Sequence, residues 1–292
     1  MKKTPLAALR QKVHACRRDP YSLVLFAGVW LAALATITAL LFVIFYILIK
    51  GIPNLTPELF AWKYNSENVS LMPALINTLL MVLLSLVLAV PVGIGSAVYL
   101  TEYARRGNRL VGMVGITAET LSGIPSIVYG LFGSLFFVKF LNMGLSLLAG
   151  ALTLSIMILP TIMRTTEEAL LAVPDSYREG SFGLGAGRLR TVFRIVLPSA
   201  IPGILSGVIL GIGRIVGESA ALIFTAGTVA EAAETLFDSA RTLSVHMYTI
   251  SGEGLYIDQT YATAVVLLVL VIVINALSEL AAKKLGGTTN NG

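Results

Sequence analysis

The chain has 292 residues, of which 56% are hydrophobic and only 13% are charged, and its mean hydropathy is +0.84. This composition excludes a soluble globular domain and predicts an integral membrane protein. A single cysteine, Cys16, and two histidines exclude a disulfide framework and a His/Cys metal cluster, while the net charge of +5 matters through its distribution.

The first predicted element is a membrane anchor behind a basic tail. Residues 1–20 carry six Lys and Arg residues against one acidic residue, Asp19. The charge-free run 20–49 that follows is longer than the ~20 residues needed to cross the hydrocarbon core of a bilayer. A signal peptide would have a shorter apolar core. We therefore expect a retained first span with its basic end in the cytoplasm.

Five further apolar runs predict five more spans, because a helix satisfies its own backbone polar groups in lipid. They cover residues 68–101, 110–138, 140–163, 195–230 and 259–278. A Gly-Ile-Pro break at Gly123–Pro125 interrupts the second of these runs, and a tight turn at Asn142–Gly144 shortens the third. The predicted fold class is all-α, a polytopic membrane protein with six transmembrane helices in one domain, 21–285, before a flexible tail, 286–292.

The distribution of basic residues assigns a side to each connection. With the N-terminus inside, the cytoplasmic segments hold 16 of the 21 Lys and Arg residues and the outer segments hold four. This division obeys the positive-inside rule, so both termini are expected in the cytoplasm. The outer loop 231–258 is acidic and is expected to be mostly solvated. Its stretch TLFDSARTL is a candidate short helix across the outer surface.

The connection 167–198 is polar, basic and longer than most links between neighbouring spans. Pro174 discourages continuation of the preceding helix, and Ser176-x-x-Glu179 has the pattern of a capping box. These signals predict a short helix outside the bilayer that begins near Ser176. A glycine-rich bend is expected to follow it, at Gly183, Gly185 and Gly187.

Charges within the apolar runs are the candidate functional residues. Arg214 falls near mid-bilayer, where a charge costs about 2.5–3.5 kcal/mol and should face the bundle interior. Glu218 is predicted one turn further along the same helix face. The two side chains either neutralise each other as an i,i+4 pair, or Arg214 presents its planar fork to a passing anion while Glu218 holds it. Residue chemistry alone leaves both alternatives open.

Two further charged residues border the predicted spans. Arg164 ends the fourth span, either as the inner exit of a pathway or as an ordinary positive-inside anchor. Glu119 lies within the third span, and the sequence does not identify its partner. The chain lacks the G-x-x-x-x-G-K-[ST] pattern of a nucleotide-binding P-loop, and His14 and His246 fall on opposite sides of the membrane. We therefore expect no enzyme activity and no bound cofactor.

The segment 167–198 resembles the EAA loop of ABC-importer permeases. The resemblance rests on Glu179-Gly180-Ser181, three residues, Gly185, nine residues, then Ile195-x-Leu197-Pro198. It implies the type I ABC-importer permease fold, with a coupling helix that docks into a cytoplasmic ATPase. The residues assigned to ATPase coupling by this resemblance are Glu179, Gly180, Ser181, Gly185, Ile195, Leu197 and Pro198. Gly180 replaces the usual alanine and is expected to weaken the helix by ~1 kcal/mol.

Three stretches are similar to phosphate-importer permeases, and to the A-type (PstA) family in particular. They are SGIPSIVYGLFG (122–133), IMRTTEEALLAVPDSYREGSFGLG (162–185) and GIGRIVGESAALIFTAG (211–227). One departure is Ala221, where the family commonly has proline. This resemblance favours the alternative in which Arg214 contacts the passing anion. It implies that Arg214, Glu218 and Arg164 line the phosphate pathway.

The resemblance also implies the rest of the assembly. The partners would be a homologous C-type permease, two ATP-binding subunits that use ATP and Mg, and an extracytoplasmic phosphate-binding protein, all at the cell inner membrane and without nucleic acid. An acidic outer loop repels free phosphate, which favours delivery by a docked carrier. Alternative functions are a permease for another oxyanion or small solute, or an ATPase-independent secondary transporter, which the EAA spacing disfavours.

Overall fold

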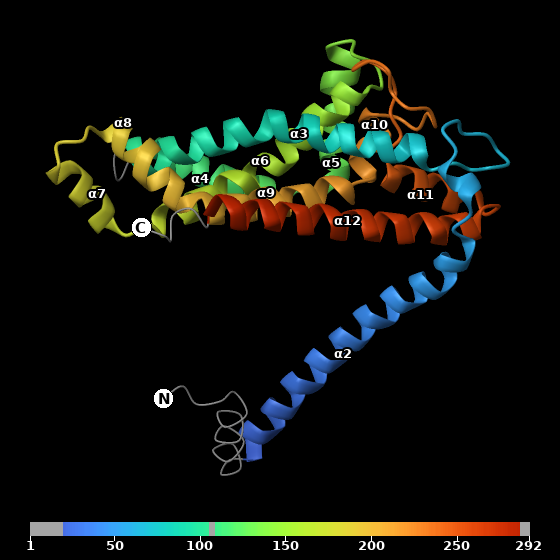
Figure 1. Cartoon of the computed structure of the whole chain (residues 1–292), viewed down its shortest axis with the longest axis horizontal. Coiled ribbons are helices and arrows are strands. Elements are labelled where there is room, and N and C mark those ends of the chain that lie inside the picture. Colours follow the sequence, from blue (N-terminus) through green and yellow to red (C-terminus); the bar gives the residue numbers. More distant parts are fainter. Residues whose placement is uncertain (1–19, 105–108, 287–292) are drawn as a thin grey trace.

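The computed structural model describes residues 20–104 and 109–286, and within these residues the chain is helical and contains no strand (Figure 1). Most of the predicted basic tail and flexible C-terminal tail lies outside the described residues. The helices are α2 (Pro20–Gly51), α3 (Met72–Val98), α4 (Arg109–Ser122), α5 (Ser126–Gly133), α6 (Leu147–Leu171), α7 (Asp175–Gly183), α8 (Arg188–Thr191), α9 (Leu197–Val216), α10 (Ala220–Thr225), α11 (Leu243–Glu253) and α12 (Ile257–Gly286).

Shorter turns of helix connect or extend these elements. Two 3₁₀ turns, η1 (Ile52–Asn54) and η2 (Pro57–Phe60), follow α2, and π-helical turns η3 (Tyr99–Tyr103), η4 (Ser134–Phe140) and η5 (Val192–Val196) adjoin α3, α5 and α9. Within the described residues, five helices are long and apolar enough to cross a membrane. The pair α4–α5 makes a sixth span if it is counted as one segment, which agrees with the predicted six-span architecture.

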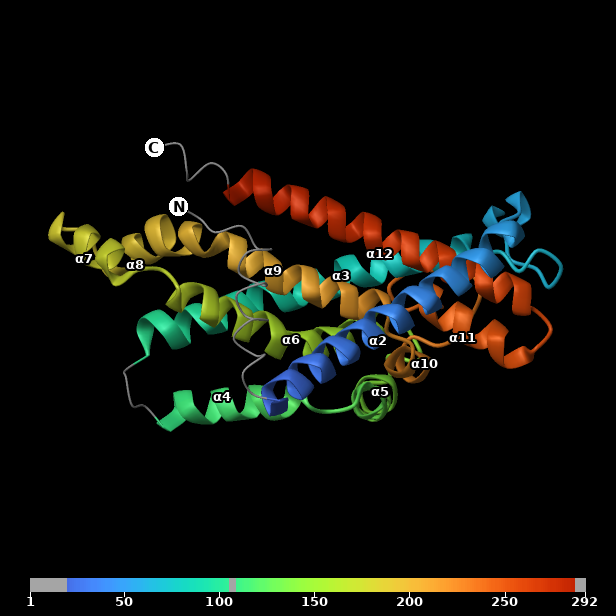
Figure 2. The ribbon, with the colours of Figure 1, turned by 90° about the horizontal axis from the view of Figure 1, so that it is seen from below.

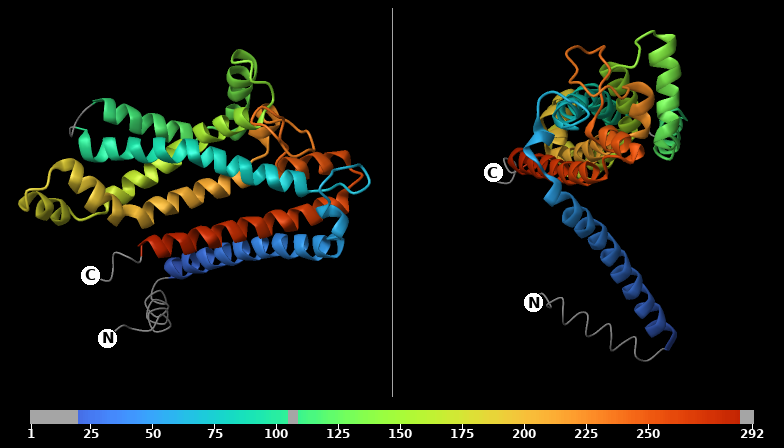
Figure 3. Two further views of the ribbon diagram at one scale, coloured as in Figure 1. Left: turned by 45° about the horizontal axis from the view of Figure 1, so that its top comes forward. Right: turned by 90° about the vertical axis from the view of Figure 1, so that its right-hand side faces the viewer.

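Four of the long helices, α3, α6, α9 and α12, lie side by side and form the body of the bundle (Figures 1 and 2). The short helices α7 and α8 extend beyond one end of this body, where the described C-terminal end of α12 also lies, whereas α11 and the segment before α3 lie at the other end (Figure 3). This arrangement places the segment 167–198 and the outer loop at opposite ends, as the six-span model requires. Which end faces the cytoplasm stays a prediction from charge.

Small residues bring α6 and α9 into close antiparallel contact. Gly207 lies against Thr165, and Gly203 lies against Ala169, so that a methyl group on either glycine would overlap its neighbour. Packing of this kind is typical of helices in lipid, where van der Waals contact replaces the hydrophobic effect as the source of association. The same pairs fix the register of α9 on α6.

The first span contacts the bundle only near its end. The rings of Tyr46 and Tyr261 meet edge to face at 5.8 Å, and Gly51 packs on the backbone of Tyr261. Away from this contact α2 is exposed and diverges from the other helices (Figures 1 and 3). An apolar helix with no polar face needs lipid or another apolar protein surface around it.

Two predicted span boundaries are wrong. The fourth span was expected to end at residue 163, but α6 continues to Leu171 because the polar residues after Arg164 extend the helix beyond the apolar run. The fifth span was expected to reach residue 230, but α9 ends at Val216, directly before Gly217. Hydropathy reports apolar length, and in these two cases it does not report where the helix stops.

The outer loop also differs from its predicted form. The stretch TLFDSARTL is not helical, because the carboxylate of Asp238 accepts hydrogen bonds from the backbone N–H groups of Glu234 and Thr235 and closes a turn. The middle of the loop is buried rather than solvated: Ala240 and Arg241 are 0% and 4% exposed, and α11 follows directly within the loop. The expectation of a solvated loop holds for the acidic residues and is wrong for this part.

Asn77 of α3 attaches the outer loop to the bundle by hydrogen bonds. Its Nδ2 donates to the carbonyl oxygens of Glu231 and Arg241 at 2.9 and 3.2 Å, and its Oδ1 accepts from the N–H of Ala233 at 2.9 Å. A fully buried amide with all these partners supplies the loop with hydrogen bonds that regular secondary structure would otherwise provide.

Candidate anion pathway and coupling segment

Two broken helices contact each other at the side of the bundle (Figure 2). The chain bends by 103° between α4 and α5, at the predicted Gly-Ile-Pro break, so that α5 runs across the direction of α4 (Figure 2). The second break separates α9 from α10 at residues 217–219. Gly130 of α5 packs directly on Ala221 of α10, since a Cβ on Gly130 would lie 2.7 Å from the Cα of Ala221. Breaks in membrane helices expose backbone polar groups and charges to a pathway.

Hydrogen bonds fix the backbone on both sides of these breaks. The hydroxyl of Tyr129 donates to the carbonyl oxygen of Leu121 at 2.8 Å, which spans the first break. The hydroxyl of Ser244, in the first turn of α11, donates to the carbonyl oxygen of Gly217 at 3.0 Å. The second break is therefore attached through α11 to the end of the bundle opposite α7.

Arg214 lies in the last turn of α9, immediately before the second break. The contacts of Gly207 with Thr165 and of Gly203 with Ala169 set an antiparallel register that places Arg214 level with Ile158, near the middle of α6. Its side chain is half-buried and makes no hydrogen bond or ion pair with the residues that the structure describes. It is close enough to Tyr129 to interact electrostatically with it.

Glu218 does not pair with Arg214. Because α9 ends at Val216, Glu218 lies beyond the helix rather than one turn further along its face, so the predicted i,i+4 geometry is wrong. Its buried carboxylate accepts from the backbone N–H of Ala221 at 3.1 Å and caps α10. The proline that the phosphate-permease family commonly has at position 221 would lack this N–H. Alanine at this position therefore retains the hydrogen-bond donor for Glu218.

Arg164 pairs with Glu119, the residue whose partner the sequence did not identify. Its Nη1 lies 3.7 Å from the Glu119 carboxylate, and its Nε lies 3.7 Å from that of Glu168. The Arg164 side chain is 52% exposed and both carboxylates are 71% exposed, so these pairs add little stability. The α6–α9 register puts Arg164 six residues below the level of Arg214, or about 9 Å along the bundle.

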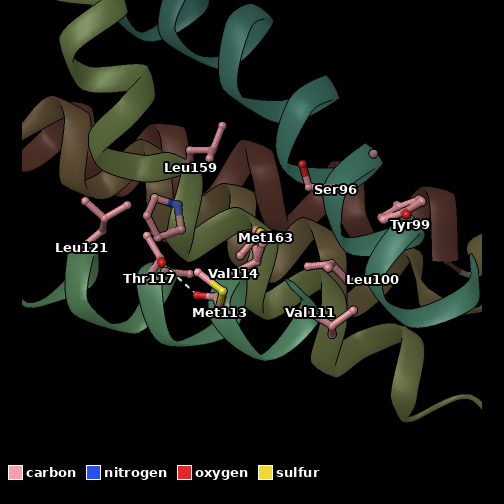
Figure 4. A pocket seen from close by; sticks show the side chains of 13 residues that line it. Ser96, Tyr99, Leu100, Val111, Met113, Val114, Thr117, Leu121, Leu159 and Met163 are labelled. Atoms are coloured by element: carbon pink, nitrogen blue, oxygen red, sulfur yellow. Dashed lines mark hydrogen bonds between the residues drawn. The ribbon is translucent and has the colours of Figure 1, made fainter. Parts of the chain in front are cut away.

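A groove of about 850 Å³ runs between α3, α4 and α6 (Figure 4). Ser96, Tyr99 and Leu100 line it from α3 and η3, Met113 and Thr117 line it from α4, and α6 closes it. None of its described lining residues is charged, and its surface is mostly apolar. This chemistry suits a lipid chain or an apolar protein surface and not an oxyanion, so the groove is not the anion pathway.

The predicted short helix is present as α7, although its capping box is not, and its role in coupling stays a prediction. The helix begins at Asp175, and its first turn receives no side-chain cap from Ser176. Glu179 and Gly180 are exposed on α7. Ser181 is buried and its hydroxyl lies 2.8 Å from that of Thr191, which joins α7 to α8. The serine in the Glu-Gly-Ser variant of the motif therefore contributes a bond that alanine lacks.

The remaining motif residues lead back into the bundle. Gly185 has φ +82°, a conformation that favours glycine, and it forms the predicted bend. Ile195 is half-buried in η5, and Leu197 and Pro198 open α9. Proline in the first turn of a helix lacks only a donor that would be unpaired there.

Arg178 fixes the orientation of α7, and sequence reasoning missed it. Its Nη2 and Nε donate to Oε1 of Glu102 at 2.7 and 3.1 Å. The same guanidinium donates to the carbonyl oxygens of Leu170 and Val173, at the end of α6, and to the carboxylate of Asp175. Glu102 is 76 residues away in the chain, so local spacing offered no signal for this pair.

Aromatic contact adds a second attachment for the coupling segment. The guanidinium of Arg188, which opens α8, lies 5.4 Å from the ring centroid of Tyr103 in η3. Tyr103 directly follows Glu102, so one turn at the end of α3 holds both α7 and α8. Three large hydrophobic side chains of the same segment are exposed: Tyr177, Phe182 and Leu184 are 52%, 47% and 92% exposed. Exposed apolar side chains of this size mark a surface that another protein covers.

Residues 89–287 match the family described as "Binding-protein-dependent transport system inner membrane component". The chain belongs to this family. It is therefore a permease subunit of an ABC importer, a membrane component that does not itself catalyse ATP hydrolysis; the ATPase is a separate subunit. This membership excludes the ATPase-independent secondary transporter that the sequence had left as an alternative.

Relatives and solved structures agree with this membership. The permease is 35% identical over 271 residues to a "Probable ABC transporter permease protein YqgI" of Bacillus subtilis, covering 86% of this chain and 90% of that one. It is 42% identical over 154 residues to "Phosphate transport system permease protein PstA 1" of Mycobacterium tuberculosis, covering 53% and 50%. A bacterial alginate ABC transporter structure matches the fold at a TM-score of 0.62 and 18% identity, covering 88% and 95%.

Proposed function

We propose that this permease carries inorganic phosphate into the cell. The observation that supports the proposal is Arg214, a half-buried cation without a described counter-charge, at the end of a helix that stops inside the bundle. An anion crossing a low-dielectric region needs a compensating cation. The guanidinium fork can donate to two phosphate oxygens at once, which an ammonium group cannot do with the same geometry.

The surroundings of Arg214 favour this role over an internal ion pair. Glu218 is committed to the N–H of Ala221, which leaves the guanidinium free to meet a substrate. Tyr129 supplies a nearby hydroxyl group, although in this conformation that hydroxyl donates to Leu121. Arg164 offers a second cation about 9 Å further along the bundle, and its exposed pairs with Glu119 and Glu168 are weak enough to exchange for a passing anion.

The similarity to relatives named as phosphate permeases supports the same substrate. By analogy with them, the working complex contains a C-type permease partner, two ATP-binding subunits that dock on the 167–198 segment, and an extracytoplasmic phosphate-binding protein. Both termini of this chain then lie in the cytoplasm. A permease for another oxyanion is the second candidate, since YqgI of Bacillus subtilis, which matches 86% of the chain, carries no substrate in its name.

The experiment that tests the proposal is ATP hydrolysis by the reconstituted complex, measured with phosphate, sulfate, arsenate and molybdate on the binding-protein side. Stimulation by phosphate, with accumulation of labelled phosphate inside the vesicles, is expected. Stimulation by sulfate or molybdate alone would assign the permease to another oxyanion. If none of the four anions stimulates ATP hydrolysis, the proposal that the permease transports an oxyanion is wrong.

Variants at Arg214 test the residue itself. Arg214→Lys keeps the charge but loses the planar fork, and phosphate transport is expected to fall about tenfold or more, since each 1.4 kcal/mol is a factor of ten. Exchange of the charges, Arg214→Glu with Glu218→Arg, is expected to stay defective because the two side chains are not paired. Uptake near the wild-type rate in the exchanged variant, with normal recovery of the complex, would make Arg214 a structural residue.

A further inference from the structure

A buried arginine, Arg241, lies at the end of the bundle opposite α7, away from Arg214. Arg241 directly precedes the N-cap residue of α11 and is 4% exposed. Its Nε and Nη2 atoms are buried and have no hydrogen-bond partner among the described residues. No carboxylate of the described chain lies within ion-pair distance of it. A buried charge without a counter-charge is costly, so it is retained where a ligand or partner compensates it.

The two free nitrogens form one edge of the guanidinium group. The N–H groups of Nε and Nη2 point in the same direction, and this edge is one that binds carboxylate and phosphate oxygens. The protein itself provides the comparison: in Arg178, the same two atoms donate to the Glu102 carboxylate at 3.1 and 2.7 Å. Arg241 presents the same edge without such a partner, which identifies an oxyanion as the complementary chemistry.

Neighbouring groups make the position polar without supplying negative charge. Thr242 and His246 lie one turn apart on α11. The hydroxyl of Thr242 and both ring nitrogens of His246 are buried without a partner at hydrogen-bond distance among the described residues. Burial, with a smaller contribution from the charge of Arg241, lowers the pKa of His246 to about 3, although the backbone of Val69 is near enough to the imidazole to raise its pKa slightly. This imidazole is therefore neutral at pH 7. A neutral imidazole and a hydroxyl can each donate one hydrogen bond to an anion.

The backbone that carries Arg241 is held rigidly. Its carbonyl oxygen accepts from Asn77, and its N–H donates to the carbonyl of Val229 at 3.3 Å. The N–H of Leu243 donates to the hydroxyl of Thr78 at 2.8 Å. Preorganised donors bind an anion without an ordering cost.

One aromatic side chain covers the group. The ring of Tyr64 lies 4.9 Å from the guanidinium carbon and meets the His246 ring edge to face at 6.1 Å. Tyr64 belongs to the segment between α2 and α3, which lies beside α11 at the end opposite α7 (Figure 1). Cation–π contact compensates part of the charge. The aromatic contact occupies a face of the guanidinium group and leaves the hydrogen-bonding capacity of its Nε and Nη2 edge unused.

We propose that Arg241, with Thr242 and His246, forms an outer anion-binding site that receives the oxyanion before it reaches Arg214. The link between the two sites is the hydrogen bond from Ser244 to the carbonyl oxygen of Gly217. Arg241 is three residues from Ser244, and Arg214 is three residues from Gly217, so both arginines lie close to this link along the chain. The identity of the anion as phosphate rests on the proposed function; the site requires only an oxyanion with at least two acceptor oxygens.

The test uses the purified complex without its binding protein and measures its thermal stability against added inorganic phosphate, with chloride at equal ionic strength as control. A ligand that binds the folded state raises the melting temperature by mass action. In Arg214→Gln, phosphate is expected to stabilise the complex still, through the outer site. Addition of Arg241→Gln is expected to weaken this response at least tenfold, and Tyr64→Ala, which uncovers the guanidinium, is expected to strengthen it.

Each other outcome counts against the site. No phosphate response in Arg214→Gln, or the same response after Arg241→Gln, would overturn it. If Arg241→Gln is not recovered folded, Arg241→Lys retains the charge without the fork, and an unchanged half-saturating phosphate concentration in this variant overturns the site equally. Loss of binding-protein association with an unchanged phosphate response would instead assign Arg241 to a carboxylate of that protein. ATP-driven uptake of labelled phosphate by the wild-type complex tests the proposed function separately.

Discussion

Arg178→Ala is expected to detach the coupling segment from the end of α3. The substitution removes the ion pair with Glu102 and the donors to the last carbonyls of α6. The side chains of Arg178 and Glu102 are only 15% and 8% exposed, so Glu102 is left as a buried carboxylate without its partner. Breaking a buried pair in this way costs about 3–5 kcal/mol. Loss on this scale should release α7 while the transmembrane helices stay inserted.

Asp175→Ala is the matched control, because it removes a second partner of the same guanidinium. The Asp175 side chain is 76% exposed, and an exposed pair contributes no more than about 1 kcal/mol. The double variant Arg178→Met with Glu102→Leu removes both charges and is expected to recover much of the lost stability, since apolar replacement of a whole buried pair is often neutral.

The assay measures two quantities for each variant: the thermal unfolding midpoint of the detergent-solubilised complex, and the amount of ATPase that co-purifies with the permease. Arg178→Ala should lower both, and Asp175→Ala should lower neither by a measurable amount. Equal values for Arg178→Ala and Asp175→Ala would refute the reasoning, because they would mean that the Glu102 pair does not hold the coupling segment.

Three further predictions use other parts of the chain. Gly185→Val places a β-branched residue at φ +82°, a cost of at least about 1–2 kcal/mol, and should reduce ATPase association measured by co-purification without affecting membrane insertion; normal association would contradict it. Single cysteines at Arg190 and Glu234, in a Cys16→Ser background, should react with an impermeant reagent from opposite sides of the membrane, and labelling of both from outside in intact cells would overturn the topology. Because the pKa of His246 is lowered to about 3, the unfolded chain binds a proton below about pH 6.5 that the folded chain does not. The complex should therefore lose about 2 kcal/mol of stability between pH 7 and pH 5, measured by thermal unfolding, and the same slope in His246→Gln would contradict this assignment.

The sequence predicted those features that depend on apolar length or on backbone chemistry. The long apolar runs correspond to five spanning helices and one bent pair in the described residues, and Pro125 and Gly185 mark the break and the bend where they were expected. These signals are local, because a proline or a left-handed glycine constrains the backbone wherever the rest of the chain lies.

Contacts between residues that are far apart along the chain could not be predicted from the sequence. Arg178 and Glu102, or Arg164 and Glu119, meet only after the helices have packed, so their spacing along the chain carries no signal. The error at Glu218 has a different cause. The apolar run continues past Val216, and neither hydropathy nor periodicity indicated that the helix stops there.

The close contact of α6 with α9 has a mechanical consequence for coupling. The segment 167–198, where we propose that the ATPase docks, joins the ends of these two helices, and Gly207 and Gly203 of α9 pack directly on α6. We therefore expect a force applied to α7 to move α6 and α9 together rather than to separate them. Arg164 lies on α6 and Arg214 lies on α9. We therefore expect a movement of α7 to displace both cations at the same time.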